Sequence, residues 1–486
     1  MIILKKKSLG WNAVLNSVRS VCSILFPLVT FPYVSRVLQV KGLGKYNFSN
    51  SIISYFLLIA GLGISTYAIR EGAKYRNSNK KITLFSSQIF TINIYSTIIS
   101  YILLILALVI FKNLRTYTIC ILIFSLEIFF TTLSVDWLYQ IYEDYDYITI
   151  RSICFQIISI ILMFLFVRNK NDYLIYASIT VFSTVGTGIV NWMNAAKLCK
   201  IYLVKNVNLK KHLKPVLIIF ASSIASMIYL NSDITILGLM KNDYIVGIYS
   251  VSTKVYQMVN TLMASLIIVT VPRLSLLIGQ GKKVGYQKLL LQVVQTIAIL
   301  TLPCSVGVFM ISKEIVILIS GNSYIRAVTS LRILCIALLF AVFTNLLTNC
   351  VLIPQKREKD VLLSTCISAL VNLVLNILLI PHWGENAAAF STVVAELVIF
   401  VMEFCYSKKF FRKESFSYES VHNFLSVLIG AISIVFVCIL VEYWPVNSVL
   451  IKLSVKILLS IIMYFSILIA LKNKIFSEYI KRMKHK

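Results

Sequence analysis

The sequence FPLVTFPYVSRVL, residues 26–38, is apolar over most of its length but contains two prolines and an arginine. Pro27 and Pro32 lack a backbone N–H donor, and a proline inside a helix removes a hydrogen bond and bends the helix axis. Arg36 adds a fixed positive charge near the end of this run. The stretch therefore predicts a bent apolar helix. Whether the solvent that surrounds this helix is water or lipid can be inferred from the composition of the chain.

That solvent is a lipid bilayer. Hydrophobic residues make up 58% of the 486 residues and charged residues only 14%, with a mean hydropathy of +0.85. Such a chain has too little polar surface to cover a water-soluble globule. About fourteen stretches are long and apolar enough to cross a membrane. They begin near Ala13, Asn47, Leu84, Thr116, Ile148, Tyr173, Pro215, Ile245, Leu289, Ser330, Val361, Ala387, Asn423 and Val449.

The N-terminal segment MIILKKKSLGW is basic and then apolar, as in a secretory signal. The apolar stretch that follows is long, carries Arg19 and lacks a small-residue cleavage pattern, so we expect a retained first helix and a protein that begins at Met1. The sequence thus predicts an all-α, polytopic membrane protein with about fourteen transmembrane helices.

The distribution of charge predicts the orientation. The chain has 47 Lys and Arg residues against 19 Asp and Glu residues, a net charge of +28. Most of the basic residues fall in both termini and in alternate loops, which predicts cytoplasmic termini in the cell (inner) membrane. Their dispersal over many segments fits anionic lipid headgroups and argues against a nucleic-acid partner.

Nothing in the sequence indicates an enzyme. The longest segments between the predicted helices, 197–214 and 407–422, are too short for a soluble domain, and the four histidines are expected in loops or the tail. No nucleotide-binding, zinc-protease or nucleophile motif occurs. The ten cysteines have no CxxC spacing and predict neither a metal site nor disulfides. We expect no catalytic residues, cofactor or metal.

A weak internal repeat suggests two related halves. GKYNFSNSI from Gly44 and GIYSVSTKV from Gly247 share the pattern GxYxxS. Two parallel six-helix bundles, with a substrate site between them at mid-membrane, are a transporter plan. The predicted parts are an N-terminal six-helix bundle (1–196), a basic cytoplasmic linker (197–214), a C-terminal six-helix bundle (215–406), and two further helices with a basic tail (407–486).

A longer stretch, PLVTFPYVSRVLQVKGLGKYNFSNSIISYFLLIAGLGISTYAIREGAKYR (27–76), resembles the N-terminal signature of the Wzx-type polysaccharide flippases. DWLYQIYEDYDYITIR (136–151), VPRLS (271–275) and LVNLVLNILLIPHWGENAAAFSTVVAE (370–396) are similar in order and spacing. Gln39-Val40-Lys41 departs from the Leu-Gly pair of the family. The resemblance implies a MATE-like fold of the multidrug/oligosaccharidyl-lipid/polysaccharide superfamily. It also implies movement of undecaprenyl-pyrophosphate-linked oligosaccharide repeat units, such as those of O-antigen, to the outer leaflet.

Two cations lie deep in predicted helices. A charge at mid-membrane is costly and usually faces a partner or a water-filled cavity. Arg19 and Lys254 are therefore candidates to bind an anionic pyrophosphate headgroup, and the resemblance supports this role because related lipid II flippases use cations on helices 1, 2 and 8. In the alternative, each cation neutralises a buried carboxylate, for which Glu127 and Glu396 are available.

Other charged residues have weaker assignments. Arg36 and Arg70 lie near helix ends and either contact substrate or extend to lipid headgroups. Asp233, together with Glu127 and Glu396, is a candidate for binding a coupling ion, Na⁺ or H⁺, or else a residue that caps or pairs with polar neighbours.

The opening stretch has a candidate role as a gate. Trp11 to Leu38 would extend about 42 Å as a straight helix, beyond a hydrocarbon thickness of about 30 Å. Pro27 and Pro32 would bend this helix, with Arg36 closing the periplasmic mouth; the alternative is that the prolines only shape packing.

We therefore predict a flippase for lipid-linked oligosaccharides that works by alternating access. Its partners would be the bilayer, the lipid-linked substrate, and a polysaccharide polymerase or other assembly proteins. The alternative is a MATE-like, cation-coupled exporter of small lipophilic cations, which would need an acidic cavity. Two basic and two acidic residues at mid-membrane leave both open.

Overall fold

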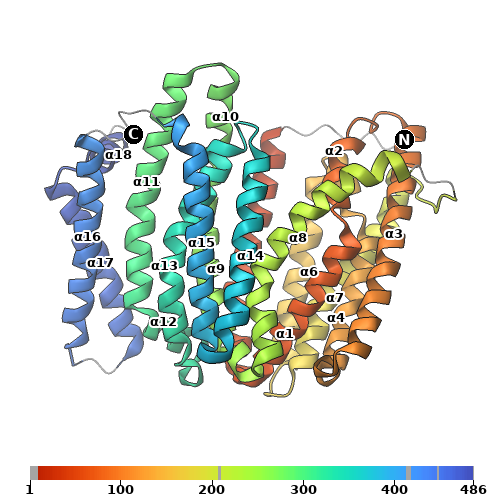
Figure 1. Ribbon diagram of the computed structural model, residues 1–486, viewed down its shortest axis with the longest axis horizontal. Helices are drawn as coiled ribbons and strands as arrows, with labels where there is room; N and C mark the ends of the chain where they lie inside the picture. Colours follow the sequence, from red (N-terminus) through yellow and green to blue (C-terminus); the bar gives the residue numbers. More distant parts are fainter. Residues whose placement is uncertain (1–8, 206–208, 412–417, 446–447, 485–486) are drawn as a thin grey trace. The chain divides into compact units, whose positions relative to one another are not determined.

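The structure is a computed structural model that describes residues 9–205, 209–411, 418–445 and 448–484, with side chains described for 26–205, 212–411, 418–445, 448–478 and 481. Within these ranges every regular element is a helix (Figure 1), which confirms the all-α prediction. The contacts of the chain divide it into two units, residues 1–247 and 248–486. The four-part division predicted from the sequence stays a prediction.

The first unit contains α1 (Leu9–Gly61), α2 (Ile64–Gly72), α3 (Asn79–Ile110), η1 (Lys112–Tyr117), α4 (Thr118–Ser134), α5 (Asp136–Ile141), α6 (Tyr145–Phe166), α7 (Tyr173–Leu198) and α8 (Leu209–Met240). Helix α9 (Asp243–Ile268) begins in the first unit and continues in the second. The second unit continues with α10 (Val271–Gly279), α11 (Lys283–Met310), α12 (Ser312–Ser320), η2 (Asn322–Tyr324), α13 (Ala327–Leu346), η3 (Leu347–Leu352), α14 (Glu358–Trp383), α15 (Glu385–Ser407), η4 (Lys408–Phe410), α16 (Tyr418–Glu442), α17 (Val449–Ala470) and α18 (Lys474–Lys484).

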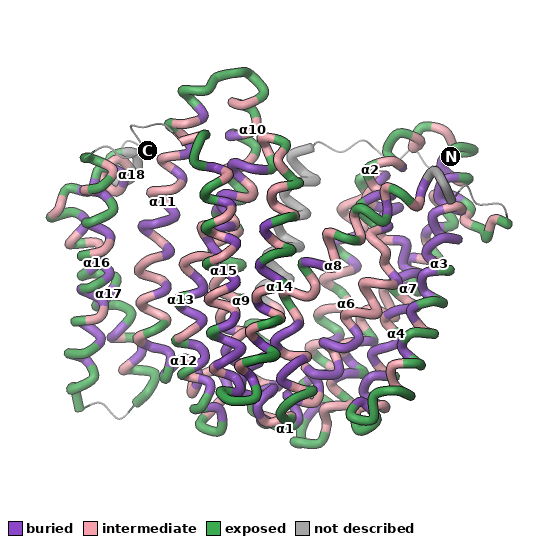
Figure 2. The backbone as a smooth tube through the Cα atoms, in the orientation of Figure 1, coloured by how far each residue is buried: buried purple, intermediate pink, exposed green. Residues whose placement is uncertain are grey.

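The helices have the length and composition of membrane spans. Among the described residues, 13 helical spans are long and apolar enough to cross a membrane, and the first of them is Phe26–Gly72. This span contains the predicted stretch that begins near Asn47 and the latter part of the one that begins near Ala13, because α1 consists of two helices merged across a kink. The exposed positions of α3, α16 and α17 are mostly Ile, Leu, Val and Phe (Figure 2), as on helices that face lipid. The chain is a polytopic membrane protein.

The kink in α1 lies at Gln39, where φ is 54° and ψ is −175°. This backbone region is adopted almost only by glycine, and the segment is the one in which the sequence resemblance leads us to expect a Leu-Gly pair. Pro27 and Pro32 both lie inside α1, before the kink. Their proposed action as a gate stays a prediction.

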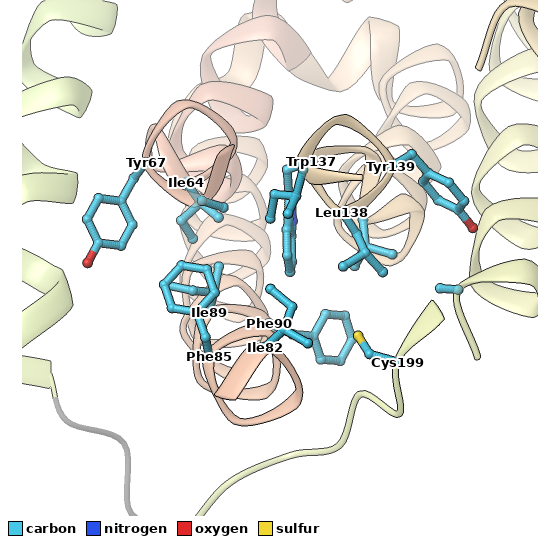
Figure 3. Close-up of a cluster of buried hydrophobic side chains, with 14 of the residues drawn as sticks. Ile64, Tyr67, Ile82, Phe85, Ile89, Phe90, Trp137, Leu138, Tyr139 and Cys199 are labelled. Carbon is cyan, nitrogen blue, oxygen red and sulfur yellow. The ribbon is translucent and has the colours of Figure 1, made fainter. Parts of the chain in front are cut away.

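The first unit packs around its short helices. α2 contacts α3, α5 and α8, and α1 contacts α3, α4, α6 and α8. Figure 3 shows Trp137 and Leu138 of α5 directed toward the apolar face of α3, where Phe85 and Phe90 lie in the same buried cluster. α2, α3 and α5 therefore share one cluster of buried apolar side chains.

The segment that follows α7 is held along α3. The backbone N–H of Tyr202 donates to Ser87 Oγ at 3.2 Å, and that of Val204 donates to Thr91 Oγ1 at 3.0 Å. This part of the predicted linker is therefore attached to the first unit, because its backbone donors are paired with α3 side chains.

The expectation that the histidines lie in loops or the tail is wrong for three of them. His382 and His422 lie in α14 and α16, and His212 lies in the first turns of α8; His485 is outside the described residues. His212 is fully buried and forms hydrogen bonds of 2.9 Å with Tyr67 Oη and with Gln88 Oε1. The error arises because the helices continue beyond the apolar stretches used to predict them.

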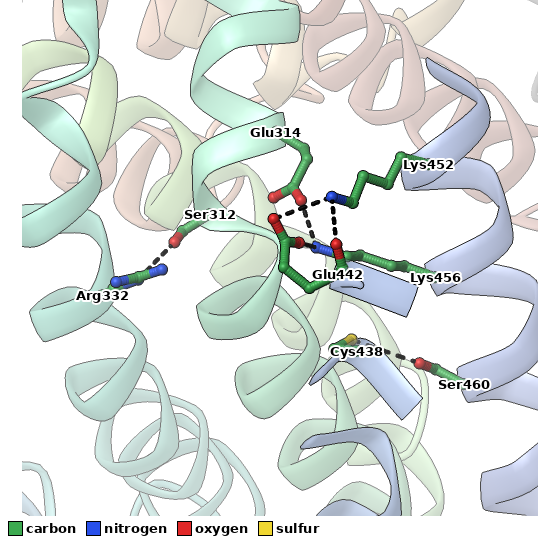
Figure 4. Close-up of polar contacts among 8 residues, drawn as sticks. All are labelled: Ser312, Glu314, Arg332, Cys438, Glu442, Lys452, Lys456 and Ser460. Carbon is green, nitrogen blue, oxygen red and sulfur yellow. Dashed lines mark hydrogen bonds and ion pairs between the residues drawn. The ribbon is translucent and has the colours of Figure 1, made fainter. Parts of the chain in front are cut away.

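The second unit has two packed groups of helices. α13, α14 and α15 pack against one another, and α16 and α17 pack together and against α11. Lys456 of α17 is 3% exposed as a side chain and lies 2.5 Å from Glu314 of α12 and 2.6 Å from Glu442 of α16. Figure 4 shows this cluster, which joins α12, α16 and α17.

Candidate functional site

In the first unit, hydroxyl groups follow the part of α1 that lies beyond the kink. Tyr46 Oη is 3.1 Å from Thr180 Oγ1 of α7, and Tyr55 Oη is 3.1 Å from Thr235 Oγ1 of α8. Thr235 in turn donates to Ser51 Oγ at 3.2 Å. Hydroxyls on membrane-spanning helices pair across helix contacts because lipid offers them no partner. α1, α7 and α8 therefore form a polar interior in this bundle.

Two of the predicted ion-coupling carboxylates lie beside this polar interior. Glu127 of α4 is half-buried and lies close enough to Tyr46 to interact electrostatically. Asp233 of α8 is 8% exposed and acts in the same way on Tyr55. No cation among the described residues of the unit forms an ion pair with Glu127. Glu127 and Asp233 thus lie near Tyr46 and Tyr55, respectively, both on α1.

Of the three predicted arginines of the first unit, two are exposed and the side chain of the third is outside those described. Arg36 is exposed on α1, three residues before Gln39. Arg70, at the end of α2, has a 61% exposed side chain and lies 3.6 Å from Glu71. Arg19 belongs to α1, but its side chain is not among those described.

In the second unit, α9 and α15 meet through polar side chains. Tyr249 Oη is 3.4 Å from Thr392 Oγ1, and Tyr256 Oη donates to Glu396 Oε1 at 3.1 Å. Seven residues separate the two tyrosines, which places both on one face of the helix. Lys254 lies two residues before Tyr256 and is half-buried. The structure therefore brings the helix that carries Lys254 into direct contact with Glu396.

Helix α15 carries two further buried carboxylates that were not predicted. Glu385 and Glu403 are both 0% exposed, and Glu396 lies between them at 6%. Their spacing of eleven and seven residues places all three on one face of the helix. Arg326 forms an ion pair with Glu385, whereas the Glu403 carboxyl lies within hydrogen-bonding distance of two hydroxyls, those of Thr348 and Ser364. A helical-wheel reading of 385–407 would have found this acidic face.

A buried arginine of the first unit also escaped the sequence analysis. Arg151 of α6 is 7% exposed, lies 3.1 Å from Asp136 and forms a hydrogen bond with Asn191 Oδ1. Asn191 Nδ2 also donates to Asp136 at 2.6 Å. A buried charge requires such pairing, so this network holds α5, α6 and α7 together. Its signal was the Asp136–Arg151 pair in the acidic loop sequence.

No group of three or more His, Cys, Asp or Glu side chains among the described residues could hold a metal ion. The described cysteines are all free thiols.

Comparison with known proteins gives consistent matches. A family model described as polysaccharide biosynthesis protein matches residues 9–277. A protein named "Putative O-antigen transporter" from Escherichia coli (strain K12) is 25% identical over 274 residues, 56% of this chain and 66% of that protein. One of the same name from Shigella dysenteriae is 22% identical over 345 residues, 69% of this chain and 84% of that protein. The match thus spans just under two thirds of the Escherichia coli relative.

Two solved structures share the fold. A lipid II flippase, MurJ, in an inward closed conformation has a TM-score of 0.76 at 16% identity and covers 98% of this chain and 100% of its own. An inward-facing multidrug resistance MATE family transporter has a TM-score of 0.57 at 13% identity, over 82% of this chain and 98% of its own. These relatives and neighbours are named as transporters or flippases, and none as an enzyme. Because the family model matches more than half of the chain, the protein belongs to the polysaccharide biosynthesis protein family, as its resemblance to the Wzx-type flippases predicts.

Proposed function

We propose that the protein is a flippase that moves undecaprenyl-pyrophosphate-linked oligosaccharide repeat units from the cytoplasmic to the outer leaflet by alternating access. The observation that carries this proposal is the likeness to a lipid II flippase over 98% of the chain, in a chain whose curated relatives are named as O-antigen transporters. The carried lipid would serve surface polysaccharide biosynthesis in the inner membrane, with both termini in the cytoplasm.

The charged headgroup and the apolar tail of the substrate need different surroundings during transport. A pyrophosphate entering a low-dielectric cavity loses hydration, and fixed cations offset that loss. Arg19 and Lys254 are the proposed cations, with Arg36 and Arg70 as further contacts on the path of the headgroup. The polyprenyl tail has no such need, because it stays among lipid chains throughout the movement.

Coupling and gating complete the proposal. Glu127, Asp233 and Glu396 are the candidate sites for a coupling ion, Na⁺ or H⁺, because each is a carboxylate within a membrane-spanning helix. Pro27 and Pro32 would let the first part of α1 bend as the cavity changes its access. A polysaccharide polymerase or other assembly proteins would receive the product.

An exporter of small lipophilic cations is the second candidate. Its support is the MATE transporter likeness, with a TM-score of 0.57, and the Glu127 and Asp233 carboxylates beside α1. The likeness is weaker and covers less of the chain than that to the lipid II flippase, so we favour the flippase.

The test is translocation of a fluorescent undecaprenyl-pyrophosphate repeat unit in proteoliposomes. The wild type should flip the lipid, whereas Arg19→Ala and Lys254→Ala should each lose most of the rate while remaining folded and monodisperse. Lys288→Ala is a matched control, because Lys288 is an exposed cation of α11. Absence of flipping by the wild type, together with saturable uptake of a lipophilic cation, would replace the flippase with the exporter.

A further inference from the structure

Glu403 is a fully buried carboxyl group with an unusual set of partners. It lies in the last turns of α15 and is 0% exposed. Thr348 Oγ1 donates to Glu403 Oε2 at 2.6 Å, and Ser364 Oγ lies 3.3 Å from Glu403 Oε1. Among the described residues, no Lys, Arg or His lies within ion-pairing distance of this carboxyl. Glu403 therefore differs from the equally buried Glu385, which is paired with Arg326.

The hydrogens available at Glu403 fit a neutral carboxylic acid. Ser364 has a single hydroxyl hydrogen and lies closer to the carbonyl oxygen of Val361, at 3.0 Å, than to Glu403. When that hydrogen goes to Val361, Ser364 Oγ keeps a lone pair that can accept from Glu403. The site then supplies one donor, Thr348, and one acceptor, Ser364, which match the C=O and the O–H of a protonated carboxyl. With the Ser364 hydrogen on Val361, an ionised Glu403 carboxylate, which can only accept hydrogen bonds, would have Thr348 as its one donor.

The surroundings of Glu403 do not supply a compensating charge. Phe400, three residues before Glu403 on α15, packs against the rings of Phe340 and Phe343 on α13. In low-dielectric packing of this kind, an ionised group without a partner costs several kcal/mol. The acidic Glu396, two turns earlier on α15, interacts unfavourably with a second negative charge at Glu403.

The charged groups on the elements around α15 already have other partners or face outward. Arg357 lies 2.5 Å from Asp360 and donates to the carbonyl oxygen of Tyr406 at 2.8 Å. Arg332 of α13 donates to Ser312 Oγ at 2.9 Å. The remaining ionisable groups of these elements are Cys335 in α13, Cys350 in η3, Glu358, Lys359, Cys366 and His382 in α14, and Lys408 and Lys409 in η4.

We propose that Glu403, Thr348 and Ser364 form a proton-binding site in which Glu403 carries a proton at neutral pH. The proton would come from water on the side where α15 ends, which is the cytoplasm in the predicted orientation. Thr348 belongs to η3, a π-helix, and such segments are frequent at functional sites. Loss of the proton would leave a charge between α15 and η3, so the protonation state of Glu403 controls this contact. The proposal holds whichever cargo is carried.

Infrared difference spectroscopy of the full-length protein in lipid nanodiscs tests the site. The wild type at neutral pH should show a protonated-carboxyl C=O band that Glu403→Gln lacks, a loss of one carboxyl per chain. Gln is isosteric and keeps both hydrogen bonds, with its amide donating to Ser364 and accepting from Thr348. Glu385→Gln is the matched control, because Glu385 is equally buried but forms an ion pair with Arg326, and its loss should leave the band unchanged.

Two further variants test the hydrogen-bond partners of Glu403 without changing Glu403 itself. Ser364→Ala removes the acceptor of the acid O–H, and Thr348→Val removes the donor to its C=O, so each should shift the band without abolishing it. Identical bands in the wild type and Glu403→Gln at all pH values would show an ionised Glu403 and overturn the proposal. A band that follows Na⁺ concentration instead of pH would also overturn it, in favour of a sodium site.

Discussion

Gly44 and Gly247 each pack against the backbone that precedes the other glycine in the chain, which leaves no space for a side chain at either position. A Cβ at Gly44 would collide with the carbonyl oxygen of Asp243, and a Cβ at Gly247 with that of Val40. Asp243 precedes Gly247 by four residues, as Val40 precedes Gly44. α1 beyond its kink and the start of α9 therefore approach closely, with equivalent residues on both sides.

The repeat in the sequence has a second structural counterpart. The tyrosine that follows each glycine in GxYxxS reaches a threonine on another helix of its own unit: Tyr46 lies 3.1 Å from Thr180 and Tyr249 lies 3.4 Å from Thr392. The glycine serves close packing and the tyrosine an interhelical hydrogen bond. Both are functions that a membrane bundle needs repeatedly.

Substitution of either glycine by alanine should destabilise the protein. A methyl group at Gly44 or Gly247 meets backbone atoms, which cannot rotate away, so one helix must shift at a cost of about 1–3 kcal/mol. We expect a lower Tm for Gly44→Ala and for Gly247→Ala in detergent unfolding. The double variant should lose less than the sum, because the first shift already separates the helices.

Gly61→Ala is the control for this prediction. Gly61 ends α1, and a Cβ there would have nothing within 4 Å. Its Tm should stay equal to or slightly above that of the wild type, since alanine favours a helix. Equal losses at Gly61 and Gly44 would mean that helix propensity and not close packing controls stability here.

Most of the fold could be predicted from the sequence because a stretch of about 20 consecutive apolar residues crosses a bilayer as a helix, which pairs its own backbone groups. The kink at Gln39 could not be placed, since its side chain gives no sign of a positive φ. The prolines, which are the usual sign of a bend, lie elsewhere in α1. Short helices such as α2 and α5 also escaped, because their burial depends on tertiary contacts and not on length or hydropathy.

The candidate site could be predicted only in part. Charges inside apolar stretches identify Lys254 and Glu396 as costly residues, but not Tyr256 as the donor to Glu396. Glu403 looks like a surface residue in sequence, because it stands near a basic loop. Its burial follows from the packing of η3 and α14 around the end of α15, which no local pattern shows.

Asp172 gives a pH-dependent prediction outside the spans. The backbone N–H groups of Arg168 and Asn169 donate to Asp172 Oδ2 at 2.9 and 2.8 Å, and these bonds lower the pKa of the carboxyl below its usual value. A depressed folded-state pKa adds stability above the unfolded pKa and loses it as the pH falls through the folded one. Asp172→Asn should therefore have a lower Tm at pH 7, and the difference should vanish in acid. A difference that is the same at all pH values would contradict this.

Loss of the Lys456 cation should be strongly destabilising. Glu314 is 8% exposed and lies 2.5 Å from Lys456, so Lys456→Ala leaves a buried carboxylate without its partner. Breaking a buried pair in this way costs about 3 kcal/mol or more. Thermal unfolding should show a large drop in Tm for Lys456→Ala and partial recovery in Lys456→Met/Glu314→Gln, which removes both charges.

Lys452→Ala is the control for that experiment, because it also removes a cation of the cluster but leaves the buried pair of Lys456 and Glu314 in place. Lys452 lies 3.0 Å from Glu442, whose side chain is 54% exposed, so water can solvate the carboxylate that remains. The expected loss is about 0–1 kcal/mol. A drop as large as that of Lys456→Ala would show that the stability depends on the total charge of the cluster and not on the burial of Glu314.

Gln39→Gly should stabilise the protein although it places glycine in a membrane helix. At φ 54° and ψ −175° a side chain costs about 1–3 kcal/mol, which exceeds the entropy that glycine loses on folding, about 0.5–1 kcal/mol. We expect a higher Tm for Gln39→Gly in detergent unfolding. Gln39→Val, the control, should lower the Tm because a β-branched residue tolerates a positive φ least. A lower Tm for Gln39→Gly would mean that the Gln39 side chain makes contacts that outweigh the strain.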